Sequence, residues 1–592
     1  MADSSFSRLS ELRAALAAQK LDGFFVPLAD EYMNEYVPEG AQRLAWLTGF
    51  TGSAGLALVL KDRAVLFVDG RYTLQAAKQV DASLFEVRHI SKAPLSDYIR
   101  QNVKAGQHLG YDAWLHTAPW LERVEEAAKA VNAKLIAVSA NPVDSIWKNR
   151  PAAPCAPVFA HPMEYAGESS NDKRARLGKQ LKEKGVDAAI LTNPASVAWL
   201  LNVRGGDVEG TPLPLSYAIL HASGRVDWFI HPAKVSAELK KTLGADVAAY
   251  PQEEFVKSLR QLGGKGLKCR VNASSAPVAV LNALKDSGAQ VDRGEDPCEL
   301  PKACKNKTEI EGMKAAHRRD GLALTKFLCW LDAQAGKVDE LAAEEKLLEF
   351  RKANNSFLYP SFHSISGAGP NGAVVHYRAS KETNRRLGKG EFYLIDSGGQ
   401  YPDGTTDVTR TVAIGDVSAE MRQNFTRVLK GHIALARACF PAGAAGAQLD
   451  VLARQYLWQA GLDYDHGTGH GVGAFLGVHE GPQNISSRSQ VPLQAGMVIS
   501  NEPGYYQAGA YGIRIENLVT VKESAKKLDE KPMLEFETLT LAPIDLRAVD
   551  VSMLNADEKT WLNTYHRAVF DAHASAMNAE ERKWLEAATK PL

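Results

Sequence analysis

The chain lacks the features that mark several large classes of protein. Its 592 residues include only six cysteines, with no CxxC pair, which argues against a disulfide framework and a thiolate zinc site and predicts buried free thiols. Lys plus Arg and Asp plus Glu both number 69, so no excess charge favours nucleic acid or an acidic membrane. No run approaches the roughly 20 apolar residues of a spanning helix. We expect a cytoplasmic location and neither nucleic acid nor membrane as a partner.

What is present is an ordinary globular composition in a chain too long for one core. Hydrophobic residues make up 45% and charged residues 23%, and single domains commonly run to about 100–200 residues. We therefore expect an α/β (α+β) protein of four parts: 1–150, 151–301, 302–545 and 546–592.

The N-terminal half contains a weak internal repeat. In each copy a helical leucine pair and an aspartate precede an apolar, strand-like run, which is residues 23–26 in the first copy and 188–191 in the second. The paired positions are Leu12, Leu16 and Asp22, and Leu177, Leu181 and Asp187. We interpret this pattern as two related α/β domains.

Local signals indicate where the parts meet. A proline-rich stretch, 142–162, is typical of a linker, and a second break falls at 294–307. Thr308 and Glu311 match a capping box at the start of a long helix. The tail from residue 551 is amphipathic and helical, which indicates an appended cap and not a catalytic unit.

Two acids stand at either end of a predicted turn between strands. An apolar run, 392–395, delivers Asp396 at its end, and Asp407 comes eleven residues later among β-branched residues that suggest an antiparallel returning strand. Two unneutralised carboxylates in one pocket repel each other, so this pair makes best sense around a cation.

A glycine-rich segment, 465–473, presents two imidazoles. It lacks the lysine of a phosphate-binding loop, so we interpret His470 as a metal ligand and His466 as a nearby polar contact. His479 follows, but Gln483 stands where the second histidine of an HExxH site belongs.

Two further acids follow strand-like runs. Glu502 ends the run 497–501, and the segment 511–517 alternates so that Arg514 and Glu516 share one face of a predicted strand. Taken singly, each acid has an ordinary explanation as a solvated or ion-paired group, and His376 as a packed core histidine.

Taken together, four carboxylates and one imidazole suit hard or borderline divalent ions. So many anionic ligands point to two ions, which can hold a bridging hydroxide and polarise a scissile carbonyl, so hydrolysis is the natural reaction.

This ordered set resembles the metal ligands of the pita-bread metallopeptidases, a family that includes methionine aminopeptidases, prolidases and aminopeptidases P. The five matching residues are Asp396, Asp407, His470, Glu502 and Glu516. Two repeat-like domains and a helical tail are most similar to the three-domain cytosolic Xaa-Pro aminopeptidases, as are the segments 49–55 and 69–72. The resemblance implies two creatinase-type N-terminal α/β domains, a pita-bread catalytic domain and a C-terminal helical extension.

The resemblance also implies roles for side chains. It makes Glu502 the general base, with His376 and His479 able to contact the oxyanion or the substrate backbone. The implied substrate-binding residues are His376, His466, His479, Tyr506 and Arg514. The cofactor is two divalent ions, with Mn²⁺ favoured and Zn²⁺ or Co²⁺ as alternatives.

The expected reaction releases the first residue from peptides with proline in second position, and a homodimer is expected from the family alone. Three alternatives stay open. One is a prolidase limited to Xaa-Pro dipeptides, and another is a metal-free creatinase, whose metal carboxylates are lost. The third is a non-catalytic pita-bread binding module, as in a histone chaperone, whose ligand set is degraded.

Overall fold

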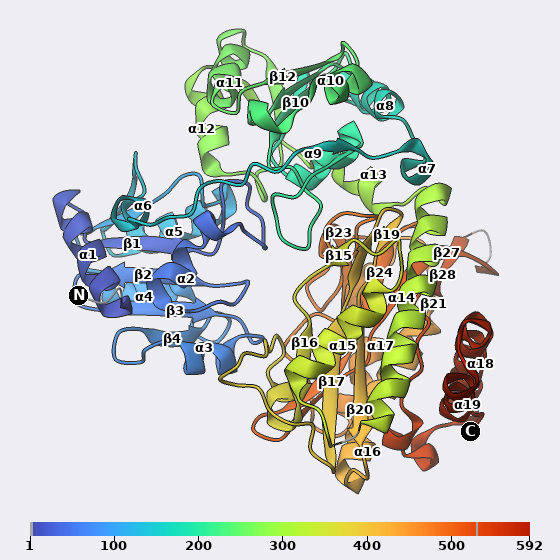
Figure 1. Ribbon diagram of the computed structural model, residues 1–592. Coiled ribbons are helices and arrows are strands. Elements are labelled where there is room, and N and C mark those ends of the chain that lie inside the picture. Colours follow the sequence, from blue (N-terminus) through green and yellow to red (C-terminus); the bar gives the residue numbers. More distant parts are fainter. Residues whose placement is uncertain (1–3, 335, 529–530) are drawn as a thin grey trace. The chain divides into compact units, whose positions relative to one another are not determined.

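The computed structural model describes residues 4–334, 336–528 and 531–592 (Figure 1). The chain divides into two compact units, Met1–Pro162 with Glu168–Glu299, and Met163–Gly167 with Leu300–Leu592. Among the helices of the described ranges, none combines the length and the apolar character needed to cross a membrane.

The first unit contains two six-stranded sheets of the same topology. The strand orders are β4-β3-β2-β1-β5-β6 and β12-β11-β10-β8-β13-β14. In the first sheet β1 is antiparallel to β2 and parallel to β5, and β3 is parallel to β4. In the second sheet β8 is antiparallel to β10 and parallel to β13, and β11 is parallel to β12. The strands are β1 (Gly23–Pro27), β2 (Leu56–Leu60), β3 (Ala64–Val68), β4 (Glu86–His89), β5 (His108–Tyr111), β6 (Lys134–Ala137), β8 (Ala188–Leu191), β10 (Tyr217–His221), β11 (Val226–Phe229), β12 (Val247–Tyr250), β13 (Lys268–Val271) and β14 (Gln290–Arg293).

The helices repeat in the same order between those strands, which confirms the predicted pair of related domains. They are α1 (Ser5–Ala18), α2 (Arg43–Thr48), α3 (Thr73–Gln79), α4 (Leu95–Asn102) and α5 (Ala118–Ala130), then α8 (Ser170–Glu183), α9 (Pro194–Leu201), α10 (Ala237–Leu243), α11 (Glu254–Gly264) and α12 (Val278–Asp286). Short additional elements are α6 (Pro142–Ile146), β7 (Phe159–Ala160) and β9 (Val203–Arg204).

The two repeat aspartates, Asp22 and Asp187, make equivalent hydrogen bonds in the two copies. Asp22 accepts a hydrogen bond from the backbone N–H of His108, which begins β5, at 2.7 Å. Asp187 accepts one from Lys268, which begins β13, at 2.8 Å. The leucines that precede each aspartate are buried against their sheets, so the sequence repeat reflects a repeat of packing.

The second unit is a set of mainly antiparallel sheets with helices around them. A three-stranded sheet has the order β16-β17-β20, and a six-stranded sheet the order β21-β28-β27-β24-β22-β23. The strands of these and the smaller sheets are β15 (Tyr359–Pro360), β16 (Ile365–Ala368), β17 (Glu391–Ser397), β18 (Gly399–Tyr401), β19 (Gly404–Thr405), β20 (Val408–Ile414), β21 (Cys439–Pro441), β22 (Gly469–Gly471), β23 (Glu480–Ile485), β24 (Val498–Asn501), β25 (Gly504–Gln507), β26 (Tyr511–Arg514), β27 (Asn517–Leu528) and β28 (Lys531–Thr538).

The helices of this unit bury apolar faces against the sheets. Tyr393 and Ile395 of β17 lie in one core with α14 and α15, and Phe392 of the same strand lies in another with α16. Alternate residues of this strand therefore fill two cores. The helices are α7 (Met163–Ala166), α14 (Lys307–Ala333), α15 (Glu340–Lys352), α16 (Ala419–Ala436), α17 (Gly446–Trp458), α18 (Ala556–His573) and α19 (Ala579–Ala588), and α13 (Glu299–Ala303) precedes α14.

Two local predictions need correction. The capping box of α14 is formed by Asn306 and Glu309, not by Thr308 and Glu311, because Asn306 holds the extended backbone of an N-cap and accepts from the Glu309 N–H. All six cysteines are free, as predicted, but only Cys269 and Cys298 are buried, and Cys155 is exposed.

Candidate metal centre and substrate site

Antiparallel pairing of β17 and β20 brings the first two predicted acids to one place. Asp396 pairs with Thr409 across the two strands, and Asp407 directly precedes β20. Both aspartates are buried, at 8% and 4% exposure. The predicted returning strand is confirmed. The segment that links β17 to β20 is short and contains the paired strands β18 and β19, which turn the chain back.

The six-stranded sheet delivers the next two residues. His470 lies in β22, and Glu502 follows the last residue of β24, a strand that pairs with β22. The His470 Nε2 atom is 3.4 Å from Asp407 Oδ2 and 3.4 Å from Glu502 Oε1. The imidazole therefore lies between two carboxylates from different strands.

Glu516 reaches the same place by a route that differs from the prediction. The segment 511–517 is not one strand, because β26 ends at Arg514 and pairs with β25, whereas β27 begins at Asn517 and pairs with β24. The chain changes partner at 515–516. The predicted shared face is nevertheless confirmed, since the side chains of Arg514 and Glu516 both contact the Thr409 hydroxyl, at 3.1 and 2.8 Å.

Crowding and burial alter the acidity of these groups. Burial, with a contribution from Asp407, raises the pKa of Asp396 to about 7, and burial also raises the pKa values of Glu502 and Glu516. Burial alone would lower the pKa of His470, but its hydrogen bond to Asp407 and the charge of Glu502 raise it to about 9. A cluster that retains protons in this way is one that divalent cations would neutralise.

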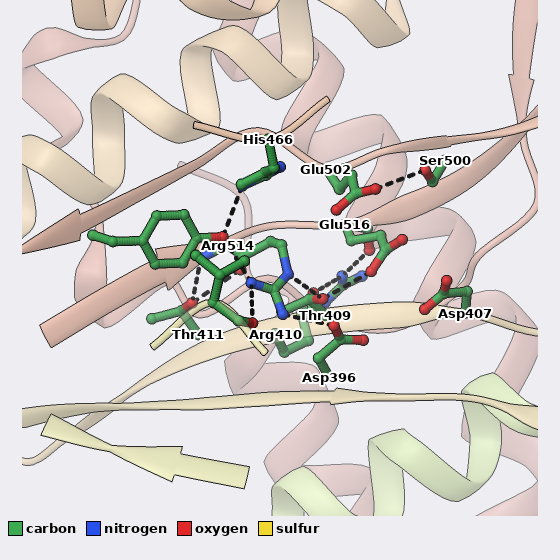
Figure 2. Close-up of polar contacts among 12 residues, drawn as sticks. Asp396, Asp407, Thr409, Arg410, Thr411, His466, Ser500, Glu502, Arg514 and Glu516 are labelled. Carbon is green, nitrogen blue, oxygen red and sulfur yellow. Dashed lines mark hydrogen bonds and ion pairs between the residues drawn. The ribbon is translucent and has the colours of Figure 1, made fainter. Parts of the chain in front are cut away.

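The donor atoms themselves fit metal ions. Ligand atoms of Asp407, His470 and Glu516 all lie within 4.8 Å of one another. Asp396 Oδ1 and Glu516 Oε1 are buried and accept no hydrogen bond from any described residue. Buried carboxylate oxygens seldom lack a partner, because burying them unpaired costs free energy. The side chains of Asp396, Asp407, Glu502 and Glu516 lie near one another (Figure 2), so a cation is the partner that fits these oxygens.

Arg514 closes one side of the cluster. Its Nη2 atom donates to Asp396 Oδ2 at 2.6 Å (Figure 2), and its Nη1 atom donates to the Tyr506 hydroxyl at 2.7 Å. Arg514 is 1% exposed. It holds one oxygen of Asp396 in place and leaves the other oxygen for a cation.

The three predicted histidines are placed around this cluster. His466 Nε2 lies 2.9 Å from the Tyr506 hydroxyl, and the His479 ring centroid is 4.3 Å from that of His470. His376 is half-buried and follows Val375, whose carbonyl accepts from Arg514 at 3.4 Å. The structure thus brings nine of the ten predicted site residues into one set of neighbouring side chains, and His376 lies one residue along the chain from a contact of Arg514.

Two residues of the site were not predicted. The Thr409 hydroxyl donates to Glu516 Oε2 and accepts from Arg514, and Ser500 donates to Glu502 Oε1 at 3.1 Å while accepting from the His470 N–H at 2.9 Å. Each stands two residues from a predicted ligand. Because side chains in strands alternate, that spacing was the signal that could have identified both.

Four family models match consecutive parts of the chain. Residues 8–145 and 149–309 match the Creatinase/Prolidase N-terminal domain. Residues 311–523 match metallopeptidase family M24, and residues 532–592 match the C-terminal region of peptidase_M24.

Full-length relatives are similar throughout. A probable Xaa-Pro aminopeptidase P of Paracoccidioides brasiliensis (strain Pb03) is 40% identical, with 99% of each chain covered. Aminopeptidase P2 of Arabidopsis thaliana is 38% identical over 97% of this chain and 86% of its own. The X-prolyl aminopeptidase of Caenorhabditis elegans, described as a cytosolic enzyme with a di-nuclear active site, is 32% identical and superposes with a TM-score of 0.95 over 100% of both chains.

Proposed function

We infer that this chain, which belongs to the Xaa-Pro aminopeptidase P family of M24 metallopeptidases, hydrolyses the bond between the first residue of a peptide and a proline in second position. A full-length relative and a solved structure that covers the whole chain carry that activity in their names. The observation that carries the proposal is the buried set of four carboxylates and one imidazole, in which two carboxylate oxygens have no hydrogen-bond donor among the described residues.

Two divalent ions are the proposed cofactor, held by the five residues predicted from the sequence. We assign Asp396 to one ion, His470 and Glu502 to the other, and Asp407 and Glu516 to both. When bound, such a pair supplies a nucleophile from water at neutral pH and withdraws electron density from the scissile carbonyl. Mn²⁺ is the ion we propose, because oxygen donors outnumber nitrogen in this set.

Glu502 is the proposed general base. Its carboxylate is held by Ser500, and burial raises its pKa, which suits a group that takes a proton from water and passes it on. The leaving nitrogen of an Xaa-Pro bond becomes a secondary amine, so it needs that proton. His376 and His479 are proposed to donate to the carbonyl oxygen as negative charge develops there.

Selectivity for proline follows from what the substrate lacks. An Xaa-Pro amide carries no N–H, so peptidases that grip this donor handle it poorly, and a pocket shaped for the ring can accept it. We propose that His466, Tyr506 and Arg514 line the substrate site, since His466 and Arg514 both contact the Tyr506 hydroxyl.

We also propose a cytoplasmic homodimer. Its functional divisions are the four expected from the sequence: 1–150, 151–301, the catalytic part 302–545 and the extension 546–592. The full-length relatives are named aminopeptidases and not prolidases, and a binding module would have no need of an intact ligand set, so both alternatives are less favoured.

The test compares peptides with one preparation of enzyme. After chelation and re-addition of Mn²⁺, Zn²⁺ or Co²⁺, release of the first residue is measured from Xaa-Pro-Yaa, Xaa-Ala-Yaa and the dipeptide Xaa-Pro. We expect metal-dependent cleavage of Xaa-Pro-Yaa well above the other two. Equal cleavage of the proline and alanine tripeptides would remove the proline claim, and cleavage of the dipeptide alone would establish a prolidase.

A further inference from the structure

Arg410 is a buried cation held entirely by neutral oxygen atoms. It is 2% exposed, and its five N–H groups face six oxygens of described residues at 2.7–3.0 Å, none of which belongs to a carboxylate, so that Nη2 shares its two hydrogens among three of them. The acceptors are the backbone carbonyls of Thr409, Glu516, Ala542 and Pro543, the side-chain oxygen of Asn517 and the hydroxyl of Tyr565. A charge this deeply buried is costly unless its surroundings are fixed.

These acceptors come from two sources. Thr409, Glu516 and Asn517 belong to the segments that carry candidate metal ligands, and Figure 2 draws Arg410 beside Thr409. The others belong to the C-terminal part of the chain: Ala542 and Pro543 precede α18, and Tyr565 lies in it. Arg410 therefore joins the C-terminal region to the backbone of Glu516 itself.

The same network continues to Glu502. The side-chain N–H₂ group of Asn517 lies 3.3 Å from His432 Nε2, and His432 Nδ1 lies 3.1 Å from the carbonyl of Asn501. A carbonyl only accepts, so Nδ1 carries the hydrogen and Nε2 accepts from Asn517. Asn501 in turn donates to the His432 carbonyl at 2.9 Å and directly precedes Glu502.

Helix α18 packs against this network with aromatic rings. The Trp561 ring stacks on Tyr565 with centroids 5.3 Å apart and meets the edge of His432 at 5.9 Å. The Tyr565 hydroxyl donates to the Ala542 carbonyl at 2.7 Å. Helix α18 thus contacts both the Arg410 guanidinium, which donates to the Glu516 carbonyl, and the His432 imidazole, which donates to the Asn501 carbonyl.

We propose that Arg410 is a positioning residue for the metal centre, and that the C-terminal region serves catalysis by holding Arg410 through Tyr565. Arg410 touches no substrate and acts through the backbone of Glu516 and through Asn517. The proposal rests on the proposed function, because it assigns a purpose to the ligand geometry of that site.

The test is Arg410→Lys, which keeps the charge but replaces a planar fork with a single ammonium. Lysine offers three donors for six acceptors, so the backbone of Glu516 loses its fixed partner. We expect Mn²⁺ affinity, measured by calorimetry on chelated full-length protein, to fall about tenfold. We expect the visible spectrum of the Co²⁺-substituted protein to change, and kcat to fall with KM within about twofold.

Arg351→Lys is the matched control. Arg351 is equally buried, in the same unit, and donates to Asp320 at 2.8 and 3.0 Å, with no hydrogen bond to a strand of the metal centre within the described part of the chain. It should lose comparable thermal stability with Mn²⁺ affinity and spectrum unchanged. A folded Arg410→Lys protein with wild-type affinity and spectrum overturns the proposal.

If the Arg410→Lys protein cannot be obtained in a folded state, Tyr565→Phe provides a second test. It preserves the ring that stacks on Trp561 and removes only the hydroxyl, so a smaller loss of Mn²⁺ affinity, about threefold, is expected. Wild-type affinity in that variant overturns the proposal. Mn²⁺ affinity is measured without a peptide substrate. The comparison of the variants with wild type therefore still tests the role of Arg410 if the proposed proline specificity is wrong.

Discussion

The guanidinium of Arg514 lies 2.6 Å from one carboxylate oxygen of Asp396, while the other oxygen of Asp396 accepts no hydrogen bond from any described residue. The Asp396 carboxylate thus accepts from Arg514 with one oxygen and has the other oxygen available to coordinate a cation. Such outer contacts orient metal ligands and are a large part of the affinity of metal sites.

Replacing Arg514 by lysine should disable the enzyme without unfolding it. The guanidinium bonds Asp396, Tyr506 and Thr409 at once, and an ammonium cannot span all three. We expect kcat/KM to fall about a hundredfold, the upper range for such contacts. Arg319→Lys, which changes the partly exposed Asp403 pair, is the control and should stay near wild type. A fully active Arg514→Lys enzyme would contradict the assigned role.

Thr409→Val tests the unpredicted hydroxyl in the site. Valine has nearly the same shape, but Glu516 loses a donor at 2.8 Å and Arg514 loses an acceptor. We expect Mn²⁺ affinity to fall about tenfold, as measured by calorimetry. The control is Thr325→Val, another fully buried threonine, whose hydroxyl has the Gly321 carbonyl of its own helix as its only partner among the described residues. Equal affinities in the two variants would show that the hydroxyl does not orient Glu516.

Glu340 fixes the loop that carries His376. Its carboxylate accepts from the backbone N–H of Ala368 at 2.7 Å and from the hydroxyl of Tyr377, the neighbour of His376, at 2.9 Å. In Glu340→Gln the amide NH₂ group would face one of these donors and leave that donor unpaired, which should lower the free energy of unfolding by about 1–3 kcal/mol. We expect a lower Tm and a raised KM with unchanged Mn²⁺ affinity.

The control for that prediction lies on the same helix. Glu349 is exposed and accepts from Lys346 of that helix at 2.5 Å, so Glu349→Gln should leave KM unchanged. If Glu340→Gln lowers Tm but leaves KM as in the wild type, the carboxylate stabilises the fold without positioning His376.

Acid should weaken the docking of α18 through His566. Burial, aided by Arg410, lowers the pKa of His566 to about 4 from an ordinary 6.5, and the neutral ring accepts from the Ile544 N–H at 3.1 Å. A group whose pKa is depressed in the folded state contributes stability above pH 6.5 that is lost as the pH falls toward 4. The loss from His566 alone is about 2 kcal/mol between pH 6.5 and pH 5.

Scanning calorimetry of wild type and His566→Gln measures this effect. Glutamine can accept the same hydrogen bond and does not titrate, so the Tm of the variant should fall less between pH 7 and pH 5. Parallel pH dependence in the two proteins would rule out the contribution, since all other titrating groups are shared.

The sequence was sufficient for features that depend on local pattern. Acids such as Asp396 and Glu502 stand where apolar, strand-like runs stop, and the repeat aspartates Asp22 and Asp187 stand at equivalent positions before a strand. The partner change at 515–516 could not be predicted, because the alternating pattern of 511–517 is continuous and only pairing with β25 and β24 divides it. Domain boundaries and the roles of individual site residues stay predictions.

The network behind the site was beyond local pattern altogether. Arg410 stands in a run of β-branched residues, and nothing in the sequence indicates that five of its six acceptors lie more than a hundred residues away. His432 reads as one polar residue in an amphipathic helix, yet it joins two strands that carry ligands. Such contacts depend on tertiary packing, which sequence periodicity does not encode.

The central claim is a centre for two ions built by Asp396, Asp407, His470, Glu502 and Glu516. Titration of the chelated protein with Mn²⁺, followed by calorimetry and by release of Xaa from Xaa-Pro-Yaa, tests it most directly. We expect saturation at two ions per chain and activity that rises with their binding. Full activity at one ion or none, with all five residues in place, would contradict it.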